Sequence, residues 1–159
     1  YPLGVIGGKR EIMELFDAEL PEKRVLIAGT YNAHPINTAA AITTLNILQR
    51  TEIYSHISVV SNLLYEGWET LFAEKGIQSI VCRNASASCI YFCENAPKDA
   101  HDILEKHDFD FDLRFRKAMI KKRVYQIPIS CNQASVSYSH WLSDIDYTLE
   151  MSTQVLNKI

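Results

Sequence analysis

The chain has 159 residues, of which 47% are hydrophobic and 22% are charged, and its formal net charge at pH 7 is −3. This composition is typical of a globular protein and excludes a disordered chain. The sequence has no basic stripe and no apolar run of the roughly 20 residues that a membrane-spanning helix needs. We therefore expect a cytoplasmic protein that binds neither nucleic acid nor a membrane.

The first 50 residues predict alternating strands and helices. Short apolar runs indicate strands over residues 3–7 and 25–29, and residues 9–17 have helical spacing. A further helix is predicted to begin at Pro35, because a proline in the first helical turn gives up no hydrogen bond, and to end near Arg50. This segment reads as the edge of a larger layered α/β body.

Residues from 51 onward predict a different architecture. Helical periodicity over 55–75 ends at Gly76, and two strands, 77–82 and 88–93, form a hairpin candidate. Further elements are expected over these ranges: helices at 97–108 and 111–122, strands at 124–129 and 135–139, and a last helix that Ser143 caps and that runs to the end of the sequence. The order predicts an α+β fold with a small, largely antiparallel sheet and helices on one side. We place the domain boundary between residues 50 and 51.

Gly29 and Thr30 are the first candidate site. A glycine lets the backbone approach a ligand closely, and a threonine hydroxyl with exposed N–H groups ahead of a helix can bind an oxyanion. The alternative is an ordinary connection between a strand and a helix. Ser130 and Asn132, in the polar loop after Pro128, form a second candidate that faces a ligand or is simply a surface turn.

The remaining chemistry-bearing residues predict no catalytic group. The five histidines lack the spacing of metal ligands or of a catalytic triad. The acidic run 108–112 lacks the glycine and later glutamate of a calcium loop, so we predict no metal site there. Cys82, Cys89, Cys93 and Cys131 lack CxxC spacing and are expected to be reduced thiols, with a structural disulfide as the alternative.

Three groups of residues, in this order, resemble the C-terminal third of the class III aminotransferases, which are fold type I pyridoxal-phosphate enzymes. They are the stretch PLGVIGGKREIM (2–13), then Gly29-Thr30 with Pro35 and an alanine-rich helix, and finally Pro128, Ser137, His140, Asp144 and Asp146. The resemblance covers nearly the whole chain and extends to glutamate-1-semialdehyde aminomutase. It implies a tail of the large cofactor-binding domain at 1–50 and the small C-terminal domain at 51–159.

The resemblance also implies an activity. Enzymes of this family hold pyridoxal phosphate on a lysine and move an amino group between an amino acid and a keto acid or aldehyde. That lysine would precede Tyr1, and Lys9 does not replace it, so we expect residues 1–159 alone to be inactive and to carry no cofactor. In the implied homodimer, Gly29 and Thr30 contact the phosphate of the partner subunit's cofactor, and Ser130 and Asn132 lie on the side of a small amino-acid substrate.

Two departures from the family pattern leave alternatives open. Asn132 stands where the aminomutases carry a glutamate, and Ala33-His34-Pro35 replaces Gly-Asn-Pro. A general aminotransferase fits at least as well as glutamate-1-semialdehyde 2,1-aminomutase, which acts in tetrapyrrole biosynthesis. A non-catalytic binding or dimerisation module is the alternative from another class.

Overall fold

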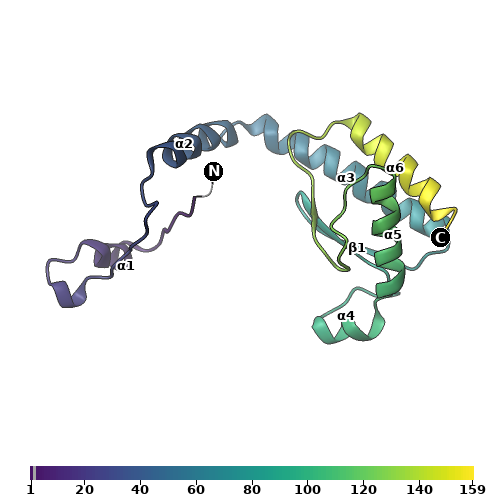
Figure 1. Ribbon diagram of the computed structural model, residues 1–159, viewed down its shortest axis with the longest axis horizontal. Helices are drawn as coiled ribbons and strands as arrows, with labels where there is room; N and C mark the ends of the chain where they lie inside the picture. The colour runs from purple at the N-terminus through teal and green to yellow at the C-terminus, as the bar shows by residue number, and fades with distance from the viewer. Residues whose placement is uncertain (2) are drawn as a thin grey trace. The chain divides into compact units, whose positions relative to one another are not determined.

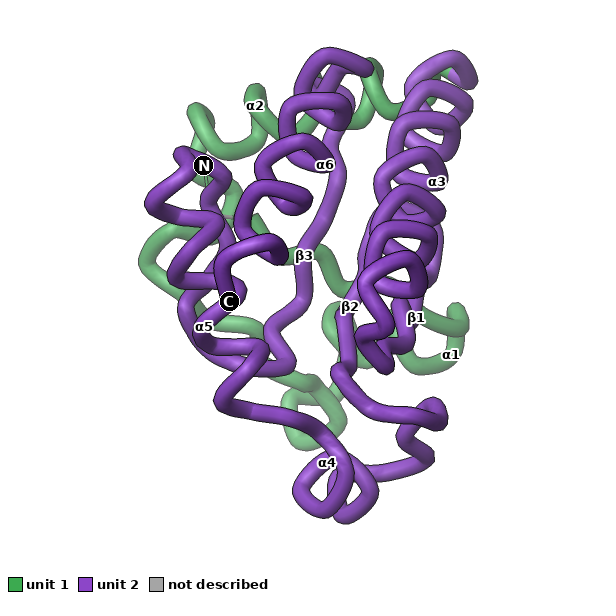
Figure 2. Tube along the Cα trace, turned by 90° about the vertical axis from the view of Figure 1, so that its right-hand side faces the viewer, with its two compact units in different colours: residues 1–50 green, residues 51–159 purple. Residues whose placement is uncertain are grey.

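The computed structural model describes residue 1 and residues 3–159 (Figure 1). Pro2, which belongs to the stretch that carries the resemblance, lies outside the described residues. The chain divides into two compact units, residues 1–50 and residues 51–159 (Figure 2). Among the described residues, no helix combines the length and apolar character needed to cross a bilayer.

The first unit is built from short helical pieces and one longer helix. The helical spacing predicted over 9–17 is confirmed as α1 (Arg10–Met13) followed by a 3-10 turn, η1 (Glu14–Asp17). A second 3-10 turn, η2 (Pro21–Lys23), precedes the longer helix α2 (Pro35–Leu48). Pro35 occupies the first turn of α2, as expected.

The two strands predicted in the first unit are wrong. Residues 3–7 and 25–29 belong to no strand of the described chain, and Val25 N–H instead donates to the Leu15 carbonyl at 2.9 Å. Val5 remains 81% exposed and Leu26 82% exposed. An apolar run becomes a strand only when a neighbouring strand accepts its backbone hydrogen bonds, and the local sequence does not supply that neighbour.

The second unit is an α+β domain, as predicted. Its elements follow in the order α3 (Thr51–Glu74), β1 (Ile80–Asn84), β2 (Ala87–Tyr91), α4 (Ala100–Lys106), α5 (Phe109–Lys121), β3 (Ala134–Ser135) and α6 (Leu142–Leu156). The described strands form one antiparallel sheet in the order β1-β2-β3. In the hairpin, Cys82 lies opposite Cys89 and Val81 opposite Ile90.

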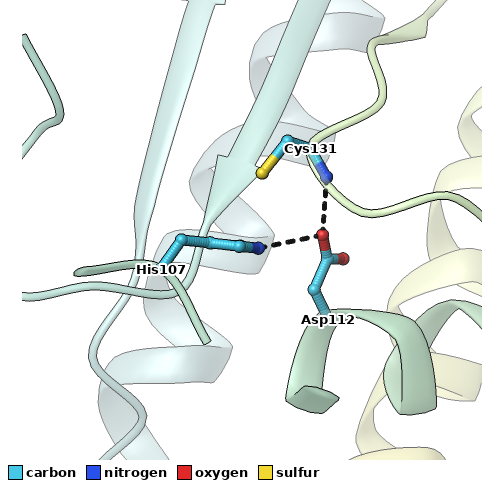
Figure 3. A group of neighbouring side chains, drawn as sticks. All are labelled: His107, Asp112 and Cys131. Atoms are coloured by element: carbon cyan, nitrogen blue, oxygen red, sulfur yellow. Dashed lines mark hydrogen bonds and ion pairs between the residues drawn. The ribbon is translucent and has the colours of Figure 1, made fainter. Parts of the chain in front are cut away.

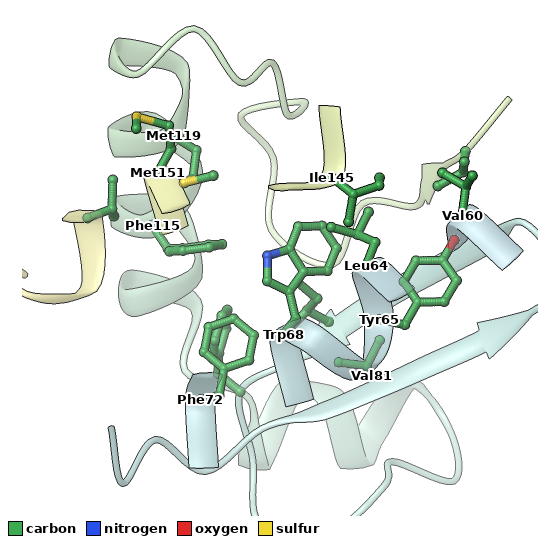
Figure 4. Packing of buried hydrophobic residues seen from close by; sticks show 14 residues of the cluster. Val60, Leu64, Tyr65, Trp68, Phe72, Val81, Phe115, Met119, Ile145 and Met151 are labelled. Carbon is green, nitrogen blue, oxygen red and sulfur yellow. The ribbon is translucent and has the colours of Figure 1, made fainter. Parts of the chain in front are cut away.

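The core of this unit lies between the sheet and the helices α3, α5 and α6 (Figure 4). Its buried members are Val60, Leu64, Tyr65, Trp68, Phe72, Val81, Ile90, Phe92, Phe115, Met119, Val136, Ile145, Met151 and Val155. Two polar contacts fix the register of this packing. Trp68 Nε1 donates to Ser152 Oγ at 3.0 Å, and the Tyr65 hydroxyl donates to the Ser86 carbonyl in the hairpin turn.

Two predictions near the end of the chain are wrong. Residues 124–129 form no strand, because Pro128 has no N–H and the Ile127 carbonyl accepts from the Arg116 side chain instead of a ladder partner. Of the strand predicted at 135–139, only Ser135 belongs to a strand, β3. Ser143 is not the cap of the last helix. Trp141 holds the N-cap position, and Asp144 accepts its backbone N–H at 2.8 Å.

Candidate functional site

Asp112 is the centre of a buried polar network at the start of α5 (Figure 3). Its Oδ1 accepts from Arg116 Nε at 2.6 Å, and its Oδ2 accepts from the backbone N–H of Cys131 at 2.8 Å. His107 Nε2 completes the set at 3.2 Å from Oδ2. The carboxylate therefore joins α5 to His107, just ahead of this helix, and to the loop at Cys131, 19 residues further along the chain.

The hydrogen bonds of His107 determine which ring nitrogen carries the proton. Its Nδ1 accepts from the backbone N–H of Phe92 at 3.0 Å, so the ring proton lies on Nε2 and is donated to Asp112. The ring is then neutral, and the charges of Asp112 and Arg116 balance each other.

Three donor atoms of this network lie close enough together to suggest a metal site. Atoms of His107, Asp112 and Cys131 all lie within 4.8 Å of one another. Yet the His107 and Asp112 donors are already committed to hydrogen bonds, and Arg116 places a positive charge on the carboxylate. Burial also raises the pKa of the Cys131 thiol to about 11, which keeps it protonated. The arrangement is that of a structural network.

The network holds the loop that contains Ser130 and Asn132. Arg116 NH1 donates to the Ile127 carbonyl at 3.4 Å, and NH2 donates to the Asn132 carbonyl at 3.2 Å. Ser130 Oγ donates to the Phe109 carbonyl at 3.1 Å. Cys131 adopts a φ of 56°, a conformation that costs energy in a residue with a side chain and that these bonds offset. Contact of this loop with a substrate stays a prediction.

Gly29 and Thr30 lie in the first unit, where the chain enters a turn ahead of α2. The Gly29 carbonyl accepts from Asn32 N–H at 3.0 Å. A Cβ on Gly29 would lie 2.7 Å from Asn32 Oδ1, so any other residue would displace that side chain. Both residues are exposed, which leaves their backbone and the Thr30 hydroxyl accessible to a ligand.

Beyond Thr30, the same turn borders a cavity of about 880 Å³. Asn32 and His34 contribute polar side chains to its lining, while Gly29 and Thr30 do not line it. His34 holds the N-cap position of α2, and its Nδ1 is a buried atom without a hydrogen-bond partner in the described part of the chain. Sequence reasoning gave His34 no ligand-binding role, although its position directly before a helix-starting proline was the available signal.

The chain shares sequence with known proteins over nearly its whole length. It is 30% identical over 158 residues to a glutamate-1-semialdehyde 2,1-aminomutase from Thermodesulfovibrio yellowstonii, a match that covers 99% of this chain and 36% of the relative. The chain thus spans about a third of the length of the curated relatives it matches. No protein-family model matches it.

The fold gives a second, independent comparison. An omega-transaminase from Sphaerobacter thermophilus superposes with a TM-score of 0.78 at 19% identity, over 95% of this chain and 34% of that one. A transaminase solved with pyridoxal phosphate bound gives a TM-score of 0.76 at 17% identity, with the same coverage. The chain is thus similar to part of a glutamate-1-semialdehyde 2,1-aminomutase in sequence and to part of known transaminases in fold. The predicted α+β fold is that of the corresponding region of these transaminases.

Proposed function

We propose that residues 1–159 form the C-terminal part of a class III aminotransferase that uses pyridoxal phosphate to transfer an amino group between an amino acid and a keto acid or aldehyde. The observation that carries this proposal is the match over 99% of the chain to an enzyme of that family, together with the transaminase fold over 95% of the chain. In this proposal residues 51–159 are the small domain and residues 1–50 the tail of the cofactor-binding domain. The apolar residues that the first unit exposes, including Val5 and Leu26, support a role as part of a larger body.

The region around Gly29 suits the phosphate of the cofactor. An α-helix begins with backbone N–H groups that have no intrahelical acceptor, and its N-terminus carries partial positive charge. Thr30 offers an exposed hydroxyl, and His34 Nδ1, which has no hydrogen-bond partner among the described residues, lies at the start of α2. When bound, pyridoxal phosphate supplies an electron sink for the reaction. We propose that Gly29 and Thr30 hold the phosphate of the partner subunit's cofactor within a homodimer.

Ser130 and Asn132 are proposed to lie on the substrate side. Their loop is attached to α5 through hydrogen bonds of Asp112 and Arg116, so the side chain of Asn132 would be presented from a fixed backbone. A fixed backbone loses little conformational entropy when a small amino acid binds.

Glutamate-1-semialdehyde 2,1-aminomutase is the second candidate function. It is favoured by the relative from Thermodesulfovibrio yellowstonii, which bears that name. The resemblance places a glutamate of the aminomutases at the position of Asn132, and this favours the general aminotransferase. A non-catalytic dimerisation module is the alternative if no cofactor-binding lysine is encoded ahead of these residues.

The test begins with the coding sequence that precedes Tyr1. We expect an in-frame Lys-x-x-Gly-Gly-Gly stretch, and we expect the protein extended to include it to develop an absorption band with pyridoxal phosphate that residues 1–159 alone do not develop. The extended protein is then assayed with amino acid and keto acid pairs and with glutamate semialdehyde. A start codon immediately ahead of the Tyr1 codon, in place of that stretch, would support the non-catalytic module.

Thr30→Ala tests the phosphate contact in the extended protein. Loss of one hydrogen bond to a charged group costs about 1.5–3 kcal/mol, so the affinity for pyridoxal phosphate should fall by about 10–100-fold. Thr43→Ala is the matched control, since Thr43 lies further along α2 and its hydroxyl donates to the Ala39 carbonyl. Equal affinities of the two variants would reject the role of Thr30.

A further inference from the structure

Cys82 and Cys89 lie directly opposite each other in the β1–β2 hairpin. Their side chains share the face of the hairpin that is opposite to core residues Val81 and Ile90, because successive residues of a strand point to alternate faces. Opposite residues of an antiparallel pair have Cβ atoms roughly 4.5–5.5 Å apart. The two free thiols are therefore close enough to bind one common metal ion.

The same face is open to solvent. Both cysteines line a shallow cavity of about 360 Å³, together with Tyr91 and with Cys131 from the loop that follows α5. Both are partly rather than fully buried, so an ion from solution can reach them. The six residues between Cys82 and Cys89 match no metal-binding spacing, and only the register of the hairpin brings the two thiols together.

The groups around the pair act in both directions on the Cys89 thiolate. Burial raises the pKa of the Cys89 thiol. A hydrogen bond with Tyr91 and the positive charge of Arg116 oppose this effect, and the Asp112 carboxylate adds to it. Arg83 also lines this cavity, but it follows Cys82 in the strand, so its side chain leaves the opposite face, and its guanidinium lies 3.6 Å from the Glu69 carboxylate of α3.

We propose that Cys82 and Cys89 form a two-thiolate site for a soft, thiophilic monovalent cation such as Cu(I). Thiolate sulfur is the ligand that such cations prefer, and two thiolates suffice for linear coordination. Binding forms two sulfur–copper bonds, releases the two thiol protons to solvent and leaves a complex with a net charge of −1. No electron is transferred, and the site is independent of the proposed aminotransferase function.

The test uses residues 1–159 with all cysteines reduced, under anaerobic conditions. Cu(I) is titrated in competition with a chromophoric Cu(I) chelator, and we expect one equivalent to bind per chain. Cys82→Ser and Cys89→Ser should each weaken binding by at least about 100-fold, because each removes half of the ligands. Cys93→Ser is the matched control: Cys93 is buried and its thiol donates to the Asn95 carbonyl at 3.2 Å.

Two further readouts sharpen the test. Since two protons leave, affinity should rise by up to about 100-fold per pH unit below the thiol pKa values. Circular dichroism of each variant shows whether the fold persists, so that lost binding is not mistaken for unfolding. Undiminished binding by both serine variants would overturn the proposal. A protein that is isolated with a Cys82–Cys89 disulfide, and that after reduction binds no Cu(I), would also overturn it.

Discussion

Arg116 and Asp112 form an ion pair one helical turn apart inside the second unit, with 2.6 Å between Nε and Oδ1. Their side chains are only 5% and 1% exposed. Two buried charges at this distance are tolerated because each neutralises the other, so neither charge is left buried without a partner. The same guanidinium also donates to the Ile127 and Asn132 carbonyls, so the pair fixes the loop as well as the helix.

Removing Arg116 should therefore destabilise the protein strongly. Arg116→Met leaves the Asp112 carboxylate buried without its countercharge, and we expect the free energy of unfolding to fall by about 3–5 kcal/mol. Urea unfolding measures this change. Lys117→Met, at the exposed neighbouring position, should change stability by less than about 0.5 kcal/mol.

The double variant Asp112→Leu/Arg116→Met should recover much of that loss, since it buries no charge. Loop attachment is read separately by hydrogen exchange at the Cys131 amide, which donates to Asp112 and should exchange faster in Arg116→Met. An Arg116→Met variant as stable as the unmodified protein would show that the pair is not buried in solution.

Gly67 lies where α3 packs closely against Leu149 of α6. A Cβ at this position would lie 2.8 Å from Cδ2 of Leu149. Alanine should gain up to about 1 kcal/mol of helix propensity but lose roughly 1–3 kcal/mol through overpacking, so Gly67→Ala should be destabilising in thermal unfolding. Leu149→Ala removes the side chain with which the new Cβ clashes. In the Leu149→Ala background, Gly67→Ala should therefore no longer destabilise the protein.

The N-terminus of α6 depends on Asp144 rather than on Ser143. Asp144 accepts the Trp141 backbone N–H at 2.8 Å and adds negative charge at the positive end of the helix. Asp144→Ala should reduce the free energy of unfolding by about 1 kcal/mol, whereas Ser143→Ala should have little effect. A larger loss of stability for Ser143→Ala than for Asp144→Ala in urea unfolding would show that Ser143 is the cap.

Stability should decline at alkaline pH. Burial raises the pKa of Cys131 to about 11 and that of Tyr91 to about 12, above the ordinary values of 9.0 and 10.0. Between the ordinary and the raised pKa of each group, the folded chain keeps a proton that the unfolded chain has lost. The stabilisation is therefore complete below about pH 9 and is lost as the pH rises toward 12. Urea midpoints across this range, under reducing conditions, measure the effect.

The matching variants assign the pH dependence. Cys131→Ser should flatten the slope between pH 9 and 11, and Tyr91→Phe should flatten it between pH 10 and 12. Tyr125→Phe is the control: this side chain is exposed, so removal of its hydroxyl should leave the slope unchanged. A slope that neither variant alters would assign the alkaline loss to other groups.

Local pattern was sufficient for the helices. Val60, Leu64 and Trp68 recur at helical spacing, and α3 buries all three, as that spacing predicted. Pro35 likewise marked the start of α2. Such signals succeed because a helix satisfies its backbone hydrogen bonds within its own segment.

Strands were less predictable, because their hydrogen bonds come from elsewhere in the chain. Residues 124–129 have the composition of a strand, yet Arg116 takes the Ile127 carbonyl that a neighbouring strand would have used. The candidate site shows the same limit. The sequence was enough to propose Gly29, Thr30, Ser130 and Asn132 as site residues. It did not predict the network that holds the loop, since His107 and Cys131 join Asp112 across intervening residues.

The sequence by itself determined the helices, the α+β class and the resemblance to the class III aminotransferases, because periodicity, terminating residues and motif order are properties of the chain. Only the tertiary structure decided which polar groups meet: Asp112 with His107 and Cys131, and Cys82 with Cys89. Those pairings depend on strand register and on the course of a loop. Both are set when a common core is buried, and residue spacing alone did not reveal which side chains would meet.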